Sequence, residues 1–177
     1  MFPFQRQWSS QGWALLPLRL LLGFGFAAHG LAKLQRGPAH FAAVLAALGV
    51  PAPTVMSWVT LVLELLGGIS VMAGLFVVPL SLPLAFVMLT AMFGVHLQYG
   101  FSSIKLQAVT AAGAEFGKPG YELNLMYLAG LLTLALGGSG AASLDHYLEG
   151  RRANRSAQSP QAVHPPADSE RSLRPRA

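Results

Sequence analysis

Residues 19–34 read RLLLGFGFAAHGLAKL, an apolar run that is interrupted by Arg19, His29 and Lys33. The run extends back to residue 13, and about 20 apolar residues are enough for a helix to cross a bilayer. Ionisable side chains are costly inside a membrane, so they normally turn toward neighbouring helices and find partners there. The stretch therefore predicts a membrane helix with one polar side that faces other parts of the protein.

The composition of the whole chain is that of a membrane protein. Of its 177 residues, 53% are hydrophobic and 11% are charged, whereas about 25% are charged in an ordinary soluble domain. The absence of cysteine excludes disulfides, iron–sulfur clusters and thiolate metal sites, and we predict no metal site. The net charge of +5 does not indicate a nucleic-acid partner, because six arginines lie beyond Gly150 in a tail rich in Pro, Ser, Ala and Gln.

Four apolar runs are long enough to cross a bilayer. They occupy residues 13–34, 54–78, 80–99 and 121–138. The predicted fold class is all-α, an integral membrane four-helix bundle with a tight antiparallel hairpin around Pro79. We divide the chain into an N-terminal segment (1–12), a four-helix transmembrane domain (13–148) and a basic tail (149–177). We expect this tail to be disordered and to lie near anionic lipid headgroups.

The two longer connections have different compositions. Residues 37–53 contain GPAHF and GVPAP, which predict turns around a short apolar centre at the membrane interface. Residues 100–120 mix aromatic and aliphatic side chains with Lys105, Glu115 and Lys118. We expect this second loop to fold back over one end of the bundle.

An even number of crossings places both termini on one side of the membrane. Positive residues near the helix ends are nearly balanced between the two sides. The side of the termini has Arg6, Arg151, Arg152 and Arg155, and the other side has Lys33, Arg36, Lys105 and Lys118. Charges far from a helix end count weakly in the positive-inside rule. We predict a multi-pass protein of the inner cell membrane whose N and C termini are cytoplasmic.

The ionisable residues of the four runs gather in one half of the predicted membrane domain. At 1.5 Å per residue, Glu64 lies about 15 Å below the surface and needs a partner. Arg19, His29 and Lys33 are the candidate partners, while His96 ends the third run and Glu122 begins the fourth on the same side. The predicted polar pocket comprises Arg19, His29, Lys33, Glu64, His96 and Glu122.

Simpler interpretations stay open for the same residues. An Arg19–Glu64 ion pair that only fixes two helices satisfies both charges. Lys33 can snorkel to the interface, and each histidine can hydrogen-bond to a neighbouring helix without any chemistry.

Small residues and a glycine-rich segment carry structural predictions. Glycines recur in the first two runs and predict close packing of those two helices, namely Gly23, Gly30, Gly67 and Gly68. The stretch GGSGAAS predicts the end of the fourth helix. A cap or interfacial turn that includes Ser143 and Asp145 is expected to follow it.

An ordered set of motifs resembles the DoxX family of small four-helix membrane proteins. The first two runs carry Arg19-Leu-Leu-Leu-Gly23, His29-Gly30-x-x-Lys33 and Leu63-Glu64-Leu-Leu-Gly67-Gly68, followed by Gly74-Leu75. The later runs carry Ala91-Met92 before His96, then Tyr121-Glu122-Leu-Asn-Leu-Met-Tyr127, then Gly138-Ser-Gly140 before Ser143-Leu-Asp145. The resemblance covers residues 15–145 and implies a four-helix membrane fold.

The resemblance also implies a role in membrane redox chemistry. The family is similar to subunits of membrane-bound systems that oxidise sulfur compounds and deliver electrons to quinone, and several relatives are linked to quinone or oxidative stress. It implies protein partners in a membrane complex. It marks a set of positions as residues of shared function or shared structure, namely Arg19, His29, Lys33, Glu64, His96, Glu122 and Asp145.

We interpret the chain as a subunit or accessory of a membrane oxidoreductase system that contacts quinone. In this hypothesis His29 or His96 hydrogen-bonds a quinone carbonyl, and Glu64 or Glu122 exchanges the accompanying proton. A b-type haem held by the two histidines is less favoured, because we expect them at different depths. The alternatives are a non-catalytic scaffold or assembly subunit and a carrier for a small solute or proton.

Overall fold

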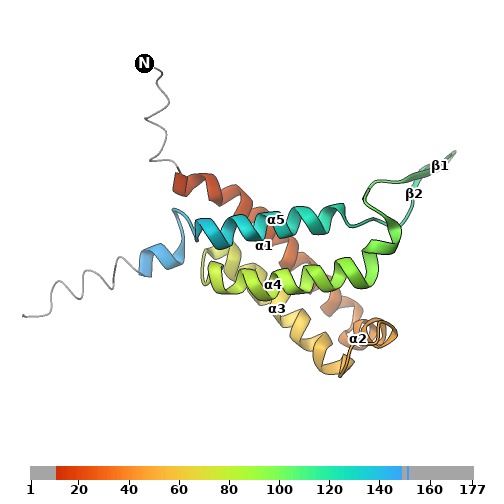
Figure 1. Ribbon diagram of the computed structural model, residues 1–177, viewed down its shortest axis with the longest axis horizontal. Coiled ribbons are helices and arrows are strands. Elements are labelled where there is room, and N and C mark those ends of the chain that lie inside the picture. Colours follow the sequence, from red (N-terminus) through yellow and green to blue (C-terminus); the bar gives the residue numbers. More distant parts are fainter. Residues whose placement is uncertain (1–10, 149–150, 152–177) are drawn as a thin grey trace, which may run out of the picture.

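The computed structural model describes residues 11–148 and Arg151 (Figure 1). Its elements are α1 (Gln11–Arg36), α2 (Pro38–Ala47), α3 (Pro53–Ala73), α4 (Val77–Ala91), β1 (Leu106–Thr110), β2 (Gly113–Phe116) and α5 (Glu122–Gly137). A π-helical turn (Met92–His96) and a 3₁₀ turn (Leu97–Tyr99) extend α4. The predicted helical membrane fold is confirmed, whereas residues 1–10 and the basic tail apart from Arg151 lie outside the described residues.

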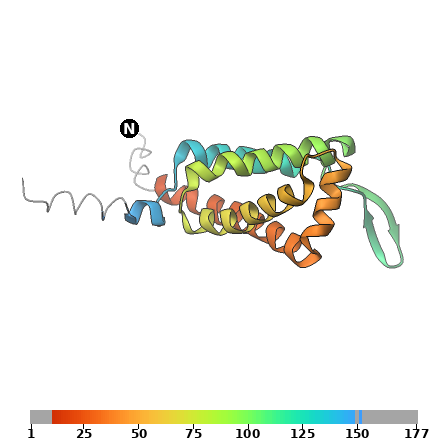
Figure 2. The same ribbon diagram turned by 90° about the horizontal axis from the view of Figure 1, so that it is seen from below.

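The four predicted apolar runs correspond to α1, α3, the extended α4 and α5. Among residues 11–148, three segments are long and apolar enough to span a membrane, namely Gly12–Arg36, Pro53–Ala73 and Val77–Tyr99. With 16 residues, α5 is about 24 Å long, which is shorter than a hydrocarbon core of about 30 Å. It lies antiparallel beside α4 (Figures 1 and 2) and completes the bundle.

Glycines allow α1 and α3 to cross with their backbones nearly in contact. A side-chain carbon added at Gly68 would lie 2.5 Å from the backbone nitrogen of Ala27 and 2.6 Å from the carbonyl oxygen of Gly23. A carbon added at Gly30 would lie 2.6 Å from the backbone nitrogen of Leu65. Such close approach is what small residues provide in membrane helix pairs.

The tight antiparallel hairpin between α3 and α4 is formed by Gly74 rather than by Pro79. Gly74 adopts a φ of 71°, the left-handed conformation that ends many helices. Pro79 lies in the first turn of α4, where a backbone N–H has no partner within the helix and its absence costs little. The predicted helix ends at residues 78 and 80 were therefore a few residues too late.

The connection between α1 and α3 contains a helix that the turn-rich sequence did not predict. Pro38 occupies the first turn of α2, where proline is favoured. The hydroxyl of Ser57 on α3 donates to the carbonyl oxygen of Pro38 at 2.7 Å and holds the start of α2 against α3.

The connection between α4 and α5 forms a β-hairpin that was predicted as a loop folded over the bundle. Strands β1 and β2 are antiparallel, with Leu106 opposite Phe116 and Val109 opposite Ala114. All of their residues are exposed. The hairpin projects beyond the end of the helices (Figures 1 and 2).

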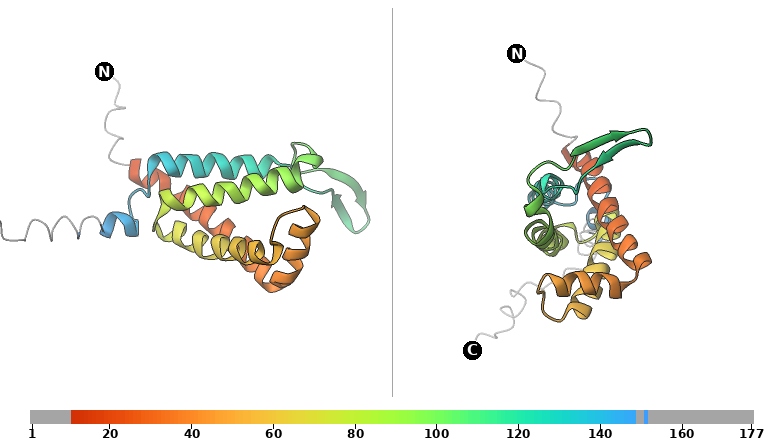
Figure 3. Two further views of the ribbon diagram at one scale, coloured as in Figure 1. Left: turned by 60° about the horizontal axis from the view of Figure 1, so that its bottom comes forward. Right: turned by 90° about the vertical axis from the view of Figure 1, so that its right-hand side faces the viewer.

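The hydrophobic core fills the half of the bundle nearest residues 11 and 148. Its buried members come from all four long helices, and they are Leu22, Phe26, Val71, Val77, Leu84, Met88, Leu131 and Leu134. Toward α2, the α1–α3 pair diverges from the α4–α5 pair (Figure 3). This divergence places a cavity in the half of the bundle that holds α2.

Candidate functional site

A cavity of about 530 Å³ lies between the two helix pairs. Small-molecule sites in proteins commonly measure about 300–1,000 Å³ and are mostly apolar with a few polar groups. Most residues that line this cavity are aliphatic or aromatic. Its polar lining residues are His29, Lys33, Thr60, Glu64, Thr90, His96, Asn124 and Tyr127. The cavity therefore has the size and the lining of a site for a largely apolar molecule.

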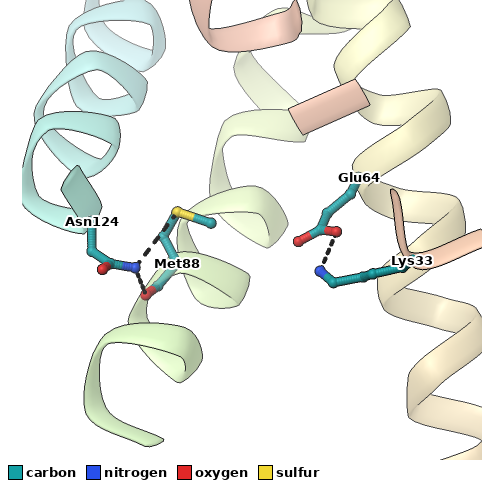
Figure 4. Close-up of polar contacts among 4 residues, drawn as sticks. All are labelled: Lys33, Glu64, Met88 and Asn124. Atoms are coloured by element: carbon teal, nitrogen blue, oxygen red, sulfur yellow. Dashed lines mark hydrogen bonds and ion pairs between the residues drawn. The ribbon is translucent and has the colours of Figure 1, made fainter. Parts of the chain in front are cut away.

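An ion pair between Lys33 and Glu64 forms one wall of the cavity (Figure 4). The ammonium of Lys33 donates to Oε2 of Glu64 and also lies 4.6 Å from the centre of the Phe41 ring on α2. The side chain of Glu64 is only 2% exposed, so its charge depends on this partner. The pair joins α1 to α3 at the end of the bundle where α2 lies.

His96 and Asn124 lie on the opposite wall, which is made by α4 and α5. Nδ1 of His96 lies 3.1 Å from the carbonyl oxygen of Pro119. His96 ends the π-helical turn, a helix irregularity that is frequent at functional sites. The amide nitrogen of Asn124 donates to the carbonyl oxygen of Met88 at 3.4 Å (Figure 4).

His29 and Tyr127 also line the cavity. His29 lies one turn before Lys33 on α1, so the two side chains share a face of the helix. The ring of Tyr127 packs edge-on against Phe26, with 5.2 Å between the ring centres. Asn124 and Tyr127 were not among the predicted pocket residues, although their spacing of three on a helix that starts at Glu122 places them on one face.

Four of the six predicted pocket residues line this one cavity, namely His29, Lys33, Glu64 and His96. Arg19 and Glu122 do not line it, and the predicted pocket is corrected at these two positions. The structure also selects Lys33 as the partner of Glu64, in place of Arg19 or His29.

The packing of α1 on α3 explains why Arg19 does not reach Glu64. The glycine contacts place Leu65 beside Gly30, so Glu64 lies level with the last turns of α1. Arg19 is about 21 Å before Lys33 along the helix, at 1.5 Å per residue. A side chain at that distance cannot form the ion pair that was considered for Arg19.

Arg19 instead holds the segment that follows α5. Its guanidinium donates to the carbonyl oxygens of Ser139 and, at 2.9 Å, of Ala142. Arg19 is 1% exposed, and both carbonyls belong to the irregular segment after α5, where backbone groups have no helical partner. We call this contact of Arg19 with residues 139–145 the Arg19 junction.

Ser143 and Asp145 belong to the same junction. Asp145 accepts hydrogen bonds from the backbone N–H groups of Phe76 at 3.1 Å and Val77 at 3.5 Å, at the start of α4. The hydroxyl of Ser143 donates to the carbonyl oxygen of Gly140 at 2.8 Å. A carboxylate at a helix N-terminus satisfies free N–H groups and favours the helix dipole, so Asp145 has the geometry of a cap.

Glu122 lies in the first turn of α5, outside the cavity. Its Oε2 accepts a hydrogen bond from the backbone N–H of Ser103 at 2.9 Å. The carboxylate thus ties the loop after α4 to the start of α5, where a negative charge is favourable. Within residues 11–148, no group of three or more His, Asp or Glu side chains has an arrangement that could hold a metal ion.

These features define a small integral membrane protein, a helical bundle with an ion pair beside a mostly apolar cavity. Residues 14–97 match the DoxX family model. This segment is a DoxX domain, and the resemblance inferred from the motifs is confirmed over these residues. The match contains His29, Lys33, Glu64 and His96, whereas α5 and Asp145 lie beyond it. No curated protein and no solved structure matches the chain.

Proposed function

We propose that this protein is a component of a membrane oxidoreductase system and binds a quinone in the cavity beside Lys33 and Glu64. The cavity itself carries the proposal. Its volume of about 530 Å³ and its apolar lining suit a substituted ring, and polar groups lie on two opposite walls (Figure 4). Quinones are such molecules, with an apolar body and one oxygen at each end of the ring.

The residues that would hold the ring come from both helix pairs. His29, Lys33 and Glu64 stand on the α1–α3 side, and His96 and Asn124 stand on the α4–α5 side. A bound quinone supplies the capacity to carry two electrons and two protons. Histidine and glutamate side chains are common proton donors and acceptors in general acid–base chemistry.

Protein partners form part of the proposal. The chain has no cysteine and therefore no iron–sulfur cluster of its own. We propose that a partner subunit exchanges electrons with the quinone and that this chain holds the quinone in the inner membrane. The termini of the chain are proposed to lie on the cytoplasmic side.

Extraction of the purified protein tests the proposal. We expect organic extracts of the full-length protein, purified in mild detergent, to contain quinone. Ala91 lines the cavity, and Ala91→Trp should remove the quinone by filling that space. Ala129 lies on an exposed face of α5, so Ala129→Trp is the matched control and should retain it.

Two results would overturn the quinone proposal. The first is the absence of quinone from both the isolated chain and its co-purified complex, which would favour a scaffold. The second is a reduced Soret band in the visible spectrum that disappears in His29→Ala or His96→Ala, which would indicate haem.

A further inference from the structure

The hydrogen bond between His96 and Pro119 fixes what His96 offers to a ligand. A carbonyl oxygen only accepts hydrogen bonds, so the proton of the neutral imidazole must lie on Nδ1, which donates to Pro119. Nε2 is then an acceptor. Neutral His96 is therefore suited to a hydroxyl group and not to a carbonyl group, in contrast to the carbonyl contact considered from the sequence.

Glu64 offers an acceptor from the facing wall. Lys33 occupies Oε2, and Oε1 has no hydrogen-bond partner among the described residues. Figure 4 shows this second oxygen turned away from Lys33, toward the side where Met88 and Asn124 lie. A carboxylate oxygen accepts and never donates.

Asn124 adds a third acceptor. Because its amide nitrogen is directed at the carbonyl oxygen and the sulfur of Met88 (Figure 4), the oxygen Oδ1 is the atom left for other partners. Tyr127 can donate or accept, and His29 has no fixed tautomer in the described structure. Lys33 is a fixed donor, but its ammonium already contacts Glu64 and the face of the Phe41 ring. The other lining groups with a fixed role are His96, Glu64 and Asn124, and all three accept.

We propose that the cavity binds the reduced, dihydroxy form of the quinone in preference to the dicarbonyl form. This inference rests on the proposed function and specifies its ligand. A hydroquinone presents one O–H donor at each end of the ring, which matches acceptors on the two walls. A quinone presents only acceptors, so its binding would bury the acceptors of the cavity without giving them a donor.

Calorimetric titration of the detergent-purified full-length protein at about pH 8, where histidine is normally neutral, tests this preference. The ligands are a decyl-substituted 1,4-hydroquinone kept reduced with ascorbate, the corresponding quinone, and the redox-inert dimethyl ether of the hydroquinone. We expect the hydroquinone to bind about tenfold or more tightly than either other compound, because each unmatched buried acceptor costs about that factor.

Variants locate the preference in the cavity. His96→Phe should lower the affinity for the hydroquinone about tenfold and leave the affinity for the quinone nearly unchanged. Thr133 is exposed on α5 and bonds only within its own helix, so Thr133→Val should keep the wild-type affinities. If His96→Phe does not fold, the affinities of the wild-type protein for the hydroquinone and for its ether still test the preference for the reduced form.

The outcomes separate the two proposals. If none of the three compounds binds, the proposed quinone function is wrong. If the quinone binds as tightly as the hydroquinone, or the ether does, the preference for the reduced form is wrong while the proposed function stands.

Discussion

At the scale of single residues, the balance of charge around Glu64 determines how the cavity end of the bundle is held. Its carboxylate is buried, and Lys33 is the cation paired with it within the described chain. The two partners are unequal, because Lys33 is 22% exposed and Glu64 only 2%. A long lysine side chain can turn to the membrane surface when it loses its partner, whereas a buried glutamate cannot.

This asymmetry predicts unequal costs for the two single substitutions. Lys33→Met should lower the free energy of unfolding by on the order of 3 kcal/mol, because it leaves a buried carboxylate unpaired. Glu64→Met should cost less, and the double variant should recover most of the loss caused by Lys33→Met. Denaturant titration in detergent measures all three.

A second pair of substitutions is the control. Arg19 contacts the segment after α5 and not Glu64, so the effects of Arg19→Met and Glu64→Met should add to within about 0.5 kcal/mol. Additive effects for Lys33→Met and Glu64→Met would contradict the role assigned to the pair.

The sequence shows which buried ionisable residues need a polar partner, but it does not show which residue that partner is. An apolar run with Glu64 inside requires a cation, and helix depth narrows the candidates to Arg19, His29 and Lys33. Which of the three pairs with Glu64 depends on how far α1 is shifted along α3. The glycine contacts between the two helices define this shift to within one helical turn. Arg19 was misplaced because the carbonyls that it satisfies belong to an irregular segment whose path no periodic pattern describes.

At the scale of elements, two adjacent glycines of α3 have different surroundings. A carbon added at Gly68 would collide with the backbone of α1, whereas one added at Gly67 would lie 3.6 Å or more from Leu63, Leu84 and Leu80. At Gly68 the neighbouring atoms belong to the backbone of α1, which cannot shift locally to make room for a side chain. Gly67 has room for a methyl group.

We predict that Gly68→Ala destabilises the protein by about 1–3 kcal/mol through overpacking. Gly67→Ala should be neutral or stabilise by up to about 1 kcal/mol, because alanine favours helix over glycine. Thermal unfolding in detergent compares the two variants. Equal effects would show that the backbones of α1 and α3 do not touch at Gly68.

The long helices follow from hydrophobic runs, whereas the connecting elements do not. Bilayer thickness makes a run of about 20 apolar residues a strong signal. Hydrophobic run length does not predict α2. Gly37 and Pro38 are typical of a helix end, although proline is also favoured in the first turn of a helix. Run length does not predict the hairpin either, whose exposed strands have no buried face to impose an alternating pattern.

At the scale of the whole molecule, the bundle is closed at one end and open at the other. The core fills the half near residues 11 and 148, and the cavity fills the half near α2. The angle between the two helix pairs creates this division (Figure 3). Sequence placed His29, Lys33, Glu64 and His96 in one half of the membrane, but the angle depends on packing across all four helices and could not be read from any one of them.

The order of the helices predicts the sidedness of the protein. Reporters fused after Gly150 and into the turn between β1 and β2 should lie on opposite sides of the membrane. With cytoplasmic termini, a fluorescent protein at the first position should fluoresce and alkaline phosphatase at the second should be active. If both reporters lie on the same side, α5 does not cross the membrane.

The Arg19 junction sets how short a working fragment of this protein can be. A fragment cut at residue 97, where the family match ends, would keep Arg19 and the start of α4 but lose Ser139, Ala142 and Asp145. A guanidinium and two backbone N–H groups would then be stripped of the acceptors they have in the full chain, at a cost of a few kcal/mol. The end of the family match therefore lies inside the folded unit. An expressed fragment has to extend past residue 145 to keep these contacts.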